Sequence, residues 1–274
     1  VRSLPGSMFK RSDIIRTQEE FNRLGYFNPE TLGVNPIPNP ETGTVDIEYT
    51  VESKSSDQLE LQGGWGNGMV VGAFSVVFNN FSTKNFFKKD SWNPMPHGDG
   101  QKIRLRAASN GRFYQNYSLS FEEPWMGGNK PNSFSASLWK TIQNFSQVSD
   151  AEEESKMDIS GFSIGFGKRL KWPDDYFTIT HSINLQRYTL VNYPSPLFNF
   201  SNGYSNNINY STTFSRNSIF NPIYPRSGSK FSIYLELTPP YSLFREKDFY
   251  ENVTDSQEKY KFLEYNKFKF DGTW

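Results

Sequence analysis

The fold of this chain is decided by the stretch Ser56-Asp57-Gln58-Leu59-Glu60-Leu61-Gln62-Gly63-Gly64-Trp65-Gly66. Here one set of residues alternates with another: Leu59, Leu61, Gly63 and Trp65 against Gln58, Glu60, Gln62 and Gly64. A period of two is typical of a β-strand with one apolar and one polar face. We therefore expect the first strand of a sheet in this stretch.

Three glycines, Gly63, Gly64 and Gly66, lie at the end of this strand. They carry no side chains to pack, so the strand is expected to pair weakly with its neighbours. In a closed barrel, a weak first strand is a candidate seam. The alternative is that these glycines only form a bulge and a tight turn with Asn67-Gly68.

The composition combines many aromatic residues with a polar average. Aromatic residues make up 17% of the 274 residues, yet the mean hydropathy is -0.67. No run of about 18 apolar residues is present, so a transmembrane helix is not expected. A β-barrel in lipid explains both facts, because alternate residues face the acyl chains and the others face a wet lumen.

Charge and chemistry-bearing residues argue against several functional classes. Lys and Arg number 29, as do Asp and Glu, so no net basic field favours nucleic acid. The chain has no cysteine, and neither of its histidines, His97 and His181, has a second ligand at metal-binding spacing. We expect no enzymatic activity, no metal and no cofactor.

The N-terminal segment, residues 1–54, is expected to form a small α+β module. Ser12 is a candidate cap of a helix that presents Ile14, Phe21 and Leu24 on one face and stops at Gly25. Extended pieces are predicted at 32–35 and 44–52, separated by a turn rich in proline at 36–43. These elements are too few to bury a core by themselves.

Residues 55–274 read as about ten strands in succession. After the first, we expect strands at 69–79, 101–109, 115–122, 132–145, a stretch ending at 162–166, 177–186, 206–216, 228–237 and 260–270. The stretch 177–186 alternates most regularly, and only His181 interrupts its apolar face. A change of phase near Gly161 predicts a bulge.

Most polar positions are Ser, Thr, Asn, Gln or Gly, which favours a wet lumen and hence a transmembrane antiparallel β-barrel over a soluble sandwich.

Three tryptophans fall in alternate links between the predicted strands: Trp92, Trp125 and Trp172. In an up-and-down barrel these links emerge at one rim, so the three side chains are candidates for an aromatic girdle at the membrane interface. The alternative is that tryptophan is simply frequent in the loops of a chain rich in aromatic residues.

Several motifs resemble the BamA family of outer-membrane assembly factors. The run from Phe9 to Phe27, with its Leu24-Gly25-Tyr26-Phe27 step, and the strand Val45–Glu52 are similar to the last POTRA domain of that family. The strand Leu59–Gly66 resembles the family's first barrel strand. Two turns are also similar to turns of the family's barrel: Glu122-Glu123-Pro124-Trp125, and the segment from Asn221 to Ser229.

This resemblance implies a location and partners. Residues 1–54 would be the C-terminal part of a periplasmic POTRA domain, and residues 55–274 the N-terminal strands of a barrel in the bacterial outer membrane. The implied partners are unfolded outer-membrane proteins, accessory assembly lipoproteins and outer-membrane lipid, but not nucleic acid. The implied lateral gate is Leu59, Glu60, Leu61, Gln62, Gly63, Gly64, Trp65 and Gly66, where a client strand would pair with an open edge.

Two departures from the family accompany the resemblance. The Val-Arg-Gly-Phe loop motif and the final strands are absent from these residues, and the link 80–100 is long for a periplasmic turn. We therefore expect an incomplete barrel whose first and tenth strands do not pair with each other. Two other functions stay open: a POTRA-barrel polypeptide secretion translocase, and a passive porin or receptor barrel with a periplasmic module.

Overall fold

A computed structural model describes residues 1–52, 57–66, 69–92, 95–128, 132–145, 155–193, 198–219, 228–246 and 249–273. The chain divides into two compact units, Val1–Gln58 with Phe78–Asp99, and Leu59–Val77 with Gly100–Trp274. The predicted domain boundary between residues 54 and 55, the predicted Asn67-Gly68 turn and most of the motif 221–229 lie outside the described residues.

The N-terminal unit contains one long helix, α1 (Arg11–Leu24). Its first turn closes on the carbonyl of Lys10, which accepts from the backbone N–H of Asp13 at 3.1 Å. Ser12 therefore lies inside the helix, and the prediction that it caps the helix is wrong. The helix ends at Gly25, whose φ of 70° is the left-handed conformation expected of a glycine stop.

A two-stranded antiparallel sheet, β1 (Gly33–Asn39) and β2 (Thr44–Thr50), follows the helix. The predicted turn 36–43 is shorter than expected, because β1 continues through Pro36 and Pro38, which pair with Ile47 and Val45. The two prolines are two residues apart and so share one edge of the strand, and an edge without a neighbour needs no N–H donor.

Phe21 of α1 packs edge-on against two rings, at 5.6 Å from Phe27 and 5.7 Å from Tyr49 of β2. Ile14 and Thr17 on the same helix are buried. Within residues 1–52 the described helices and strands are only α1, β1 and β2, so the predicted partial POTRA domain is not evident.

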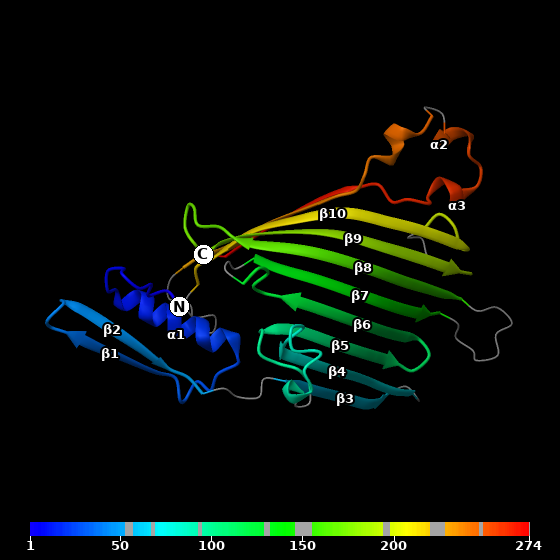
Figure 1. Cartoon of the computed structure of the whole chain (residues 1–274). Coiled ribbons are helices and arrows are strands. Elements are labelled where there is room, and N and C mark those ends of the chain that lie inside the picture. The colour runs from blue at the N-terminus through cyan, green and yellow to red at the C-terminus, as the bar shows by residue number, and fades with distance from the viewer. Residues whose placement is uncertain are drawn as a thin grey trace. The chain divides into compact units, whose positions relative to one another are not determined.

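The second architectural feature is a ten-stranded sheet in which the strands lie in chain order, from β3 at one edge to β12 at the other (Figure 1). Its members are β3 (Gln58–Gly66), β4 (Met69–Phe81), β5 (Gln101–Asn110), β6 (Tyr114–Glu123), β7 (Asn132–Asn144), β8 (Lys156–Arg169), β9 (Phe177–Val191), β10 (Gly203–Asn217), β11 (Lys230–Leu237) and β12 (Asn266–Thr273). The up-and-down order matches the prediction from the sequence. Over the described residues the sheet is not closed, because β3 and β12 do not pair with each other.

The bulge predicted at Gly161 is absent. The register between β7 and β8 is continuous from Asn132↔Lys168 to Asn144↔Lys156. The change of phase has another cause: Met157 and Ile159, at the start of β8, belong to a small cluster around Leu190 on the opposite face from Phe162. The apolar residues at the start of β8 lie on one face and those at its end on the other, and in the sequence this change of face looks like a bulge.

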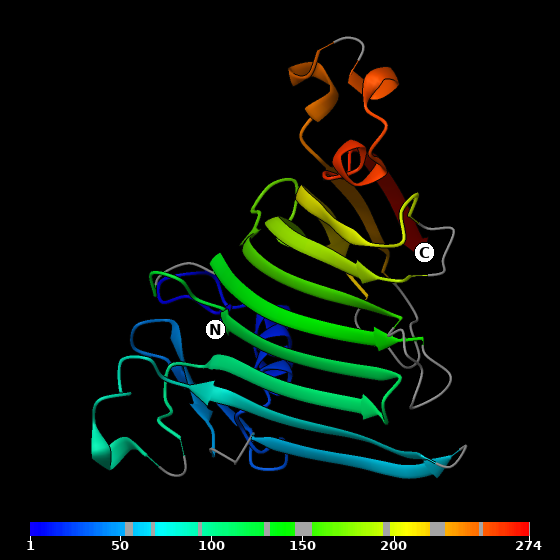
Figure 2. The same cartoon turned by 90° about the vertical axis from the view of Figure 1, so that its right-hand side faces the viewer.

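β12 begins six residues later than predicted, at Asn266 instead of Tyr260. The preceding residues pair with β10 instead: Asn206 donates its backbone N–H to Lys261 at 2.8 Å and accepts from Leu263 at 2.9 Å. The link from β11 to β12 also contains three short helices, η2 (Tyr241–Phe244), α2 (Phe249–Asn252) and α3 (Ser256–Lys259). Figures 1 and 2 show this link projecting beyond the sheet.

None of the helices in the described part of the chain has the length and apolar character needed to cross a membrane.

Candidate functional site

The register places apolar side chains in continuous rows along one face of the sheet. One row, read across β5 to β10, is Leu105, Leu119, Leu138, Phe162, Leu185 and Ile208. The next row is Ile103, Phe121, Ala136, Ile164, Ile183 and Tyr210. These side chains lack a cover, since 50% of Leu138 and 57% of Ile183 is exposed. Such a belt is what lipid requires of the outside of a barrel.

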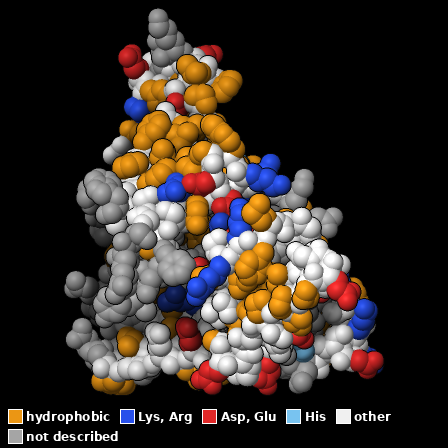
Figure 3. All heavy atoms as spheres, turned by 90° about the vertical axis from the view of Figure 1, so that its left-hand side faces the viewer, with side chains coloured by type: hydrophobic (Ala, Val, Ile, Leu, Met, Phe, Trp, Pro, Cys, Tyr) orange, Lys and Arg blue, Asp and Glu red, His pale blue; other side chains and the backbone are white. Residues whose placement is uncertain are grey.

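The belt continues to the last strand of the sheet. On β9 it extends from Phe177 to Leu185, about 26 Å along the strand. On β12 it consists of Phe268 and Phe270, which the register places level with His181 and Ile179 of β9. Figure 3 shows hydrophobic side chains gathered below the link that carries α2 and α3.

The opposite face of the sheet is polar and extensively hydrogen-bonded. Asn184 connects three strands, since it accepts from Ser163 on β8 at 2.6 Å and donates to Asn209 on β10 at 2.7 Å. Ser182 and Ser211 continue this network at 2.7 Å. Asn209 and Ser211 are buried, whereas their apolar-face neighbour Tyr210 is exposed. The polar face is thus the more crowded of the two, as expected of the face that would line a barrel lumen.

Tyr265, at the end of the link before β12, fastens that link to the polar face. Its hydroxyl donates to Glu236 at 2.7 Å and accepts from Asn207 at 3.0 Å. Burial first, and then the hydrogen bond to Glu236, raise the pKa of Tyr265 to about 12. The phenol is therefore neutral at physiological pH and remains a donor to the carboxylate.

The predicted gate, Leu59 to Gly66, occupies nearly all of β3, the first edge of the sheet. A Cβ on Gly64 would contact Val71 at 3.5 Å, so Gly64 shares a face with Val71. The alternate residues Leu59, Leu61 and Trp65 then lie with Phe74 on the apolar face, and they are 64%, 73% and 75% exposed. The structure brings all the predicted gate residues together on one edge strand.

The two edges of the sheet differ in charge. β12 carries Lys267, Lys269 and Asp271, and charged residues, lysine above all, are a common device against unwanted pairing at an edge. β3 carries a single charge, Glu60, and three glycines. The β3 edge therefore has the least protection against pairing with another strand.

Gly63 and Gly64 lie within the extended strand, and neither has a positive φ. A Cβ on Gly63 would come no nearer than 4.0 Å to another atom. The glycines are therefore not required by sterics at these two positions. That these glycines weaken the pairing of β3 stays a prediction.

The three predicted girdle residues are all exposed: Trp92 by 43%, Trp125 by 48% and Trp172 by 83%. Trp125 and Trp172 occupy the β6–β7 and β8–β9 links, which emerge at one rim. Trp92 follows η1 (Lys89–Ser91) in the other unit and donates its indole N–H to the carbonyl of Phe86 at 2.9 Å. Contact with lipid stays a prediction for all three.

Both histidines have local partners. His97 Nδ1 lies 2.8 Å from the carbonyl of Met95, and His181 Nδ1 lies 2.6 Å from the hydroxyl of Tyr210. Across the described ranges, no group of three or more His, Cys, Asp or Glu is arranged to hold a metal ion.

Sequence reasoning missed one row of residues on the apolar face. Lys140 continues the even-numbered apolar series of β7, after Phe134, Ala136 and Leu138, and Arg187 continues the odd-numbered series of β9. The period-two pattern contained this signal, because a cation in phase with an apolar face marks the end of the apolar belt.

Comparison with solved structures supports this fold. The chain is similar to BamA from Haemophilus ducreyi in a crystal structure that lacks POTRA domains 1–3, with 17% identity and a TM-score of 0.51. The match covers 87% of this chain but only 44% of that one, so the chain spans less than half of that BamA structure. Comparison with curated proteins gives no match.

Comparison with family models matches residues 97–273 to the Omp85 superfamily domain. This region is well over half of the 274 residues and includes the sheet from β5 to β12. The resemblance to the BamA family is thereby confirmed at the level of the superfamily. Together, the apolar belt, the polar face and this match establish that the chain belongs to the Omp85 superfamily.

Proposed function

We propose that this chain is part of a core subunit that folds and inserts β-barrel proteins into the bacterial outer membrane. The observation that carries the proposal is the unprotected edge of β3, which combines three glycines with a single charge. Membership of the Omp85 superfamily supports an outer-membrane location and a role in protein insertion or translocation.

The mechanism follows from the cost of unpaired backbone groups in lipid. An edge strand leaves N–H and C=O groups that lack partners, and each costs several kcal/mol in hydrocarbon. A client strand that pairs with β3 satisfies both sets of groups at once. Because Leu59, Leu61 and Trp65 lie on the apolar face, the new hydrogen bonds would form within the lipid-facing wall. No chemical step and no cofactor is needed.

The remaining parts of the proposal concern topology. The N-terminal module, with α1, β1 and β2, would be the C-terminal part of a periplasmic POTRA domain that receives clients and accessory lipoproteins. Strands outside these 274 residues would complete the barrel, since both edges of an open sheet are costly in lipid. β3 and the final strand would then form a gate that opens sideways.

The test is site-specific crosslinking during assembly of a client barrel. A photoreactive residue at Glu60 on β3 is expected to capture client strands, whereas one at Lys269 on β12 serves as the matched control and should capture none. Cysteines that lock Leu59–Gly66 to the final strand should block insertion. Normal client insertion through a locked seam would rule out the lateral mechanism.

A polypeptide secretion translocase is the second candidate, since the polar face would also suit a wet channel. Depletion separates the two functions. Loss of many unrelated outer-membrane proteins would support the assembly factor, whereas loss of one secreted partner would support the translocase. If neither occurred while solute uptake fell, a passive porin or receptor would be the better assignment.

A further inference from the structure

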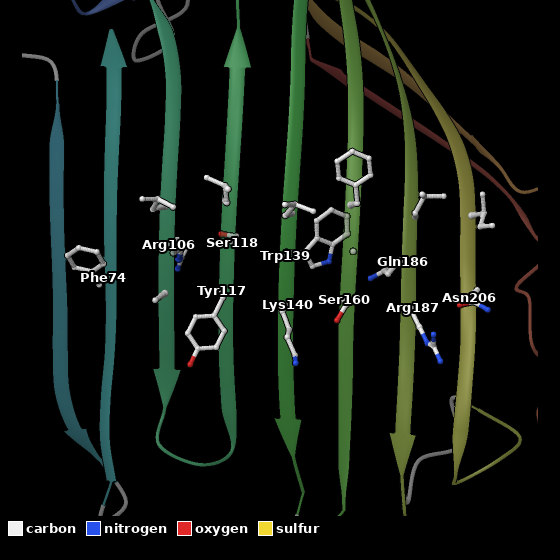
Figure 4. A pocket seen from close by; sticks show the side chains of 18 residues that line it. Phe74, Arg106, Tyr117, Ser118, Trp139, Lys140, Ser160, Gln186, Arg187 and Asn206 are labelled. Carbon is white, nitrogen blue, oxygen red and sulfur yellow. The ribbon is translucent and has the colours of Figure 1, made fainter. Parts of the chain in front are cut away.

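A shallow hollow of about 890 Å³ lies over the apolar face, between two rows of side chains (Figure 4). One side of the hollow is the row of apolar residues that pair with one another across β5 to β10: Leu105, Leu119, Leu138, Phe162, Leu185 and Ile208. Its other side is the adjacent row on the same face, Ala107, Tyr117, Lys140, Ser160, Arg187 and Asn206. We refer to this second row as the cationic row.

The cationic row places a small hydroxyl residue between two cations. Ser160 on β8 pairs with Lys140 on one side and with Arg187 on the other, and all three are exposed. Neighbouring strands are about 4.8 Å apart, so the Cα atoms of Lys140 and Arg187 are separated by about 10 Å. Ser160 presents only a small hydroxyl between them, and Figure 4 shows the Arg187 side chain extending away from Ser160 toward β10.

The guanidinium of Arg187 is held in place by stacking. It lies 4.1 Å from the ring centre of Tyr204, an arrangement that leaves its N–H donors free for another partner. The Nζ atom of Lys261 lies 5.9 Å from the centre of the same ring. Within the described residues neither Lys140 nor Arg187 forms an ion pair. Two cations without an ion-pair partner are thus presented toward the apolar side.

One carboxylate lies near these cations on the same face. Asp158 is two residues before Ser160 on β8, and its Oδ1 is buried without a hydrogen-bond partner. The cations still exceed it in number, and its charge opposes an anion bound in front of Ser160. Asp158 therefore gives the site a residue whose neutralisation should strengthen anion binding.

We propose that this hollow binds a phosphorylated glycolipid of the lipid A type, an inference that rests on the proposed outer-membrane location. Its phosphates would lie on Lys140 and Arg187, and its acyl chains along the apolar row. That row crosses six strands and is about 24 Å wide, wider than the two chains of a phospholipid. The Cα atoms of Lys140 and Arg187 are about 10 Å apart, and Tyr204 holds the guanidinium of Arg187 on the β10 side, so the two cations suit a head group with two phosphates better than one with a single phosphate.

The position along the strands agrees with this ligand. Lys140 lies near the end of β7, at the rim where β3 also ends, whereas the N-terminal module joins the start of β3. If that module is periplasmic, the cationic row lies in the outer leaflet. Tyr117 in the same row is 48% exposed and is an amphipathic residue of the kind found at membrane interfaces.

The experiment compares lipid binding by the full chain in phosphatidylcholine nanodiscs, titrated separately with lipid A, dephosphorylated lipid A and phosphatidylglycerol. We expect lipid A to bind most tightly. The variant K140Q/R187Q should lose about tenfold to thirtyfold in affinity for lipid A. The matched control K102Q/R104Q removes one lysine and one arginine from the other face of β5, outside the lining of the hollow, and should change the affinity less than about twofold. D158N should bind lipid A more tightly than the wild type.

Three outcomes would overturn the proposal: an equal loss in K102Q/R104Q, equal binding of dephosphorylated lipid A, or equal binding of phosphatidylglycerol. The titration contains no client, so it is independent of the crosslinking at β3. Crosslinking of clients at Glu60 without lipid A binding would contradict only the proposed lipid site. Lipid A binding without client crosslinking would contradict the proposed assembly function and support a glycolipid site on an outer-membrane barrel.

Discussion

At the scale of single residues, Gly161 and Trp139 explain how a bulky ring fits on the crowded polar face. The two residues are paired across β7 and β8, and a Cβ at position 161 would overlap the indole of Trp139. The glycine is therefore required by its neighbour, and not by its own backbone conformation. Because Gly161 has no side chain, the indole of Trp139 can lie against β8 on the polar face.

Gly161→Ala is expected to destabilise the sheet by about 1–3 kcal/mol, because the indole must leave its position. The measurement is the free energy of unfolding in urea, with the protein in lipid vesicles. In the background of Trp139→Ala, the same glycine substitution should cost less than half as much. Equal costs in both backgrounds would mean that the contact with the indole does not decide the effect.

Tyr265→Phe is expected to loosen the link between β11 and β12, because Glu236 loses a donor while partly buried. The loss of about 1 kcal/mol should speed trypsin cleavage at Lys259 and Lys261 about fivefold. Tyr250→Phe on the same link is the control, since the described structure gives its hydroxyl no hydrogen bond. Equal cleavage of both variants would argue against the role of the Tyr265 hydroxyl.

The pH dependence of this contact has a definite sign. The pKa of Tyr265 is raised to about 12 in the folded state, above the ordinary value of 10.0. A raised pKa means that the protonated phenol stabilises the fold fully below about pH 10 and that this contribution is lost as the pH rises through about 12. The contribution of Tyr265 to the protease resistance of the link should thus be constant between pH 6 and 9.

At the scale of elements, the conformation of β3 links stability to activity. Gly63→Ala and Gly64→Ala add a Cβ where the nearest atoms are 4.0 Å and 3.5 Å away, so neither substitution is crowded. Together they should slow amide hydrogen exchange in β3 by stiffening it, with a gain of about 0.5–1 kcal/mol for each residue. If β3 is the working edge, client insertion should slow in the same variant. Slower exchange with unchanged insertion would separate the glycines from function.

The sequence was informative about most elements because period two persists wherever a strand has one apolar face. The order of the ten strands and the position of Leu59–Gly66 in an edge strand followed from that pattern. The pattern was misleading where apolar residues of one strand lie on both faces of the sheet, and where a segment pairs only through its backbone. Met157 and Ile159 join a cluster on the polar face, and Lys261 to Leu263 pair with β10 through backbone atoms that no side-chain pattern reveals. The cationic row was missed because its residues lie on strands far apart in the sequence.

At the scale of the whole molecule, adjacent residues of one strand are expected to differ in their surroundings, because one faces lipid and the next faces water. A fluorophore attached at Leu138→Cys should be quenched by brominated lipid, since Leu138 belongs to the apolar belt. The same fluorophore at Ser137→Cys should instead be quenched by a water-soluble reagent. Because the two positions are neighbours on β7, equal quenching by lipid would contradict the assignment of the faces.

The unequal edges of the sheet give the proposed insertion a direction. Under that proposal a client strand is added beside β3, whereas Lys267 and Lys269 make β12 a poor place for any strand other than the next one of its own barrel. In the vocabulary of polymers, the proposed sheet grows at one active end. The same property predicts a risk, because two copies that meet at an unoccupied β3 would pair with each other.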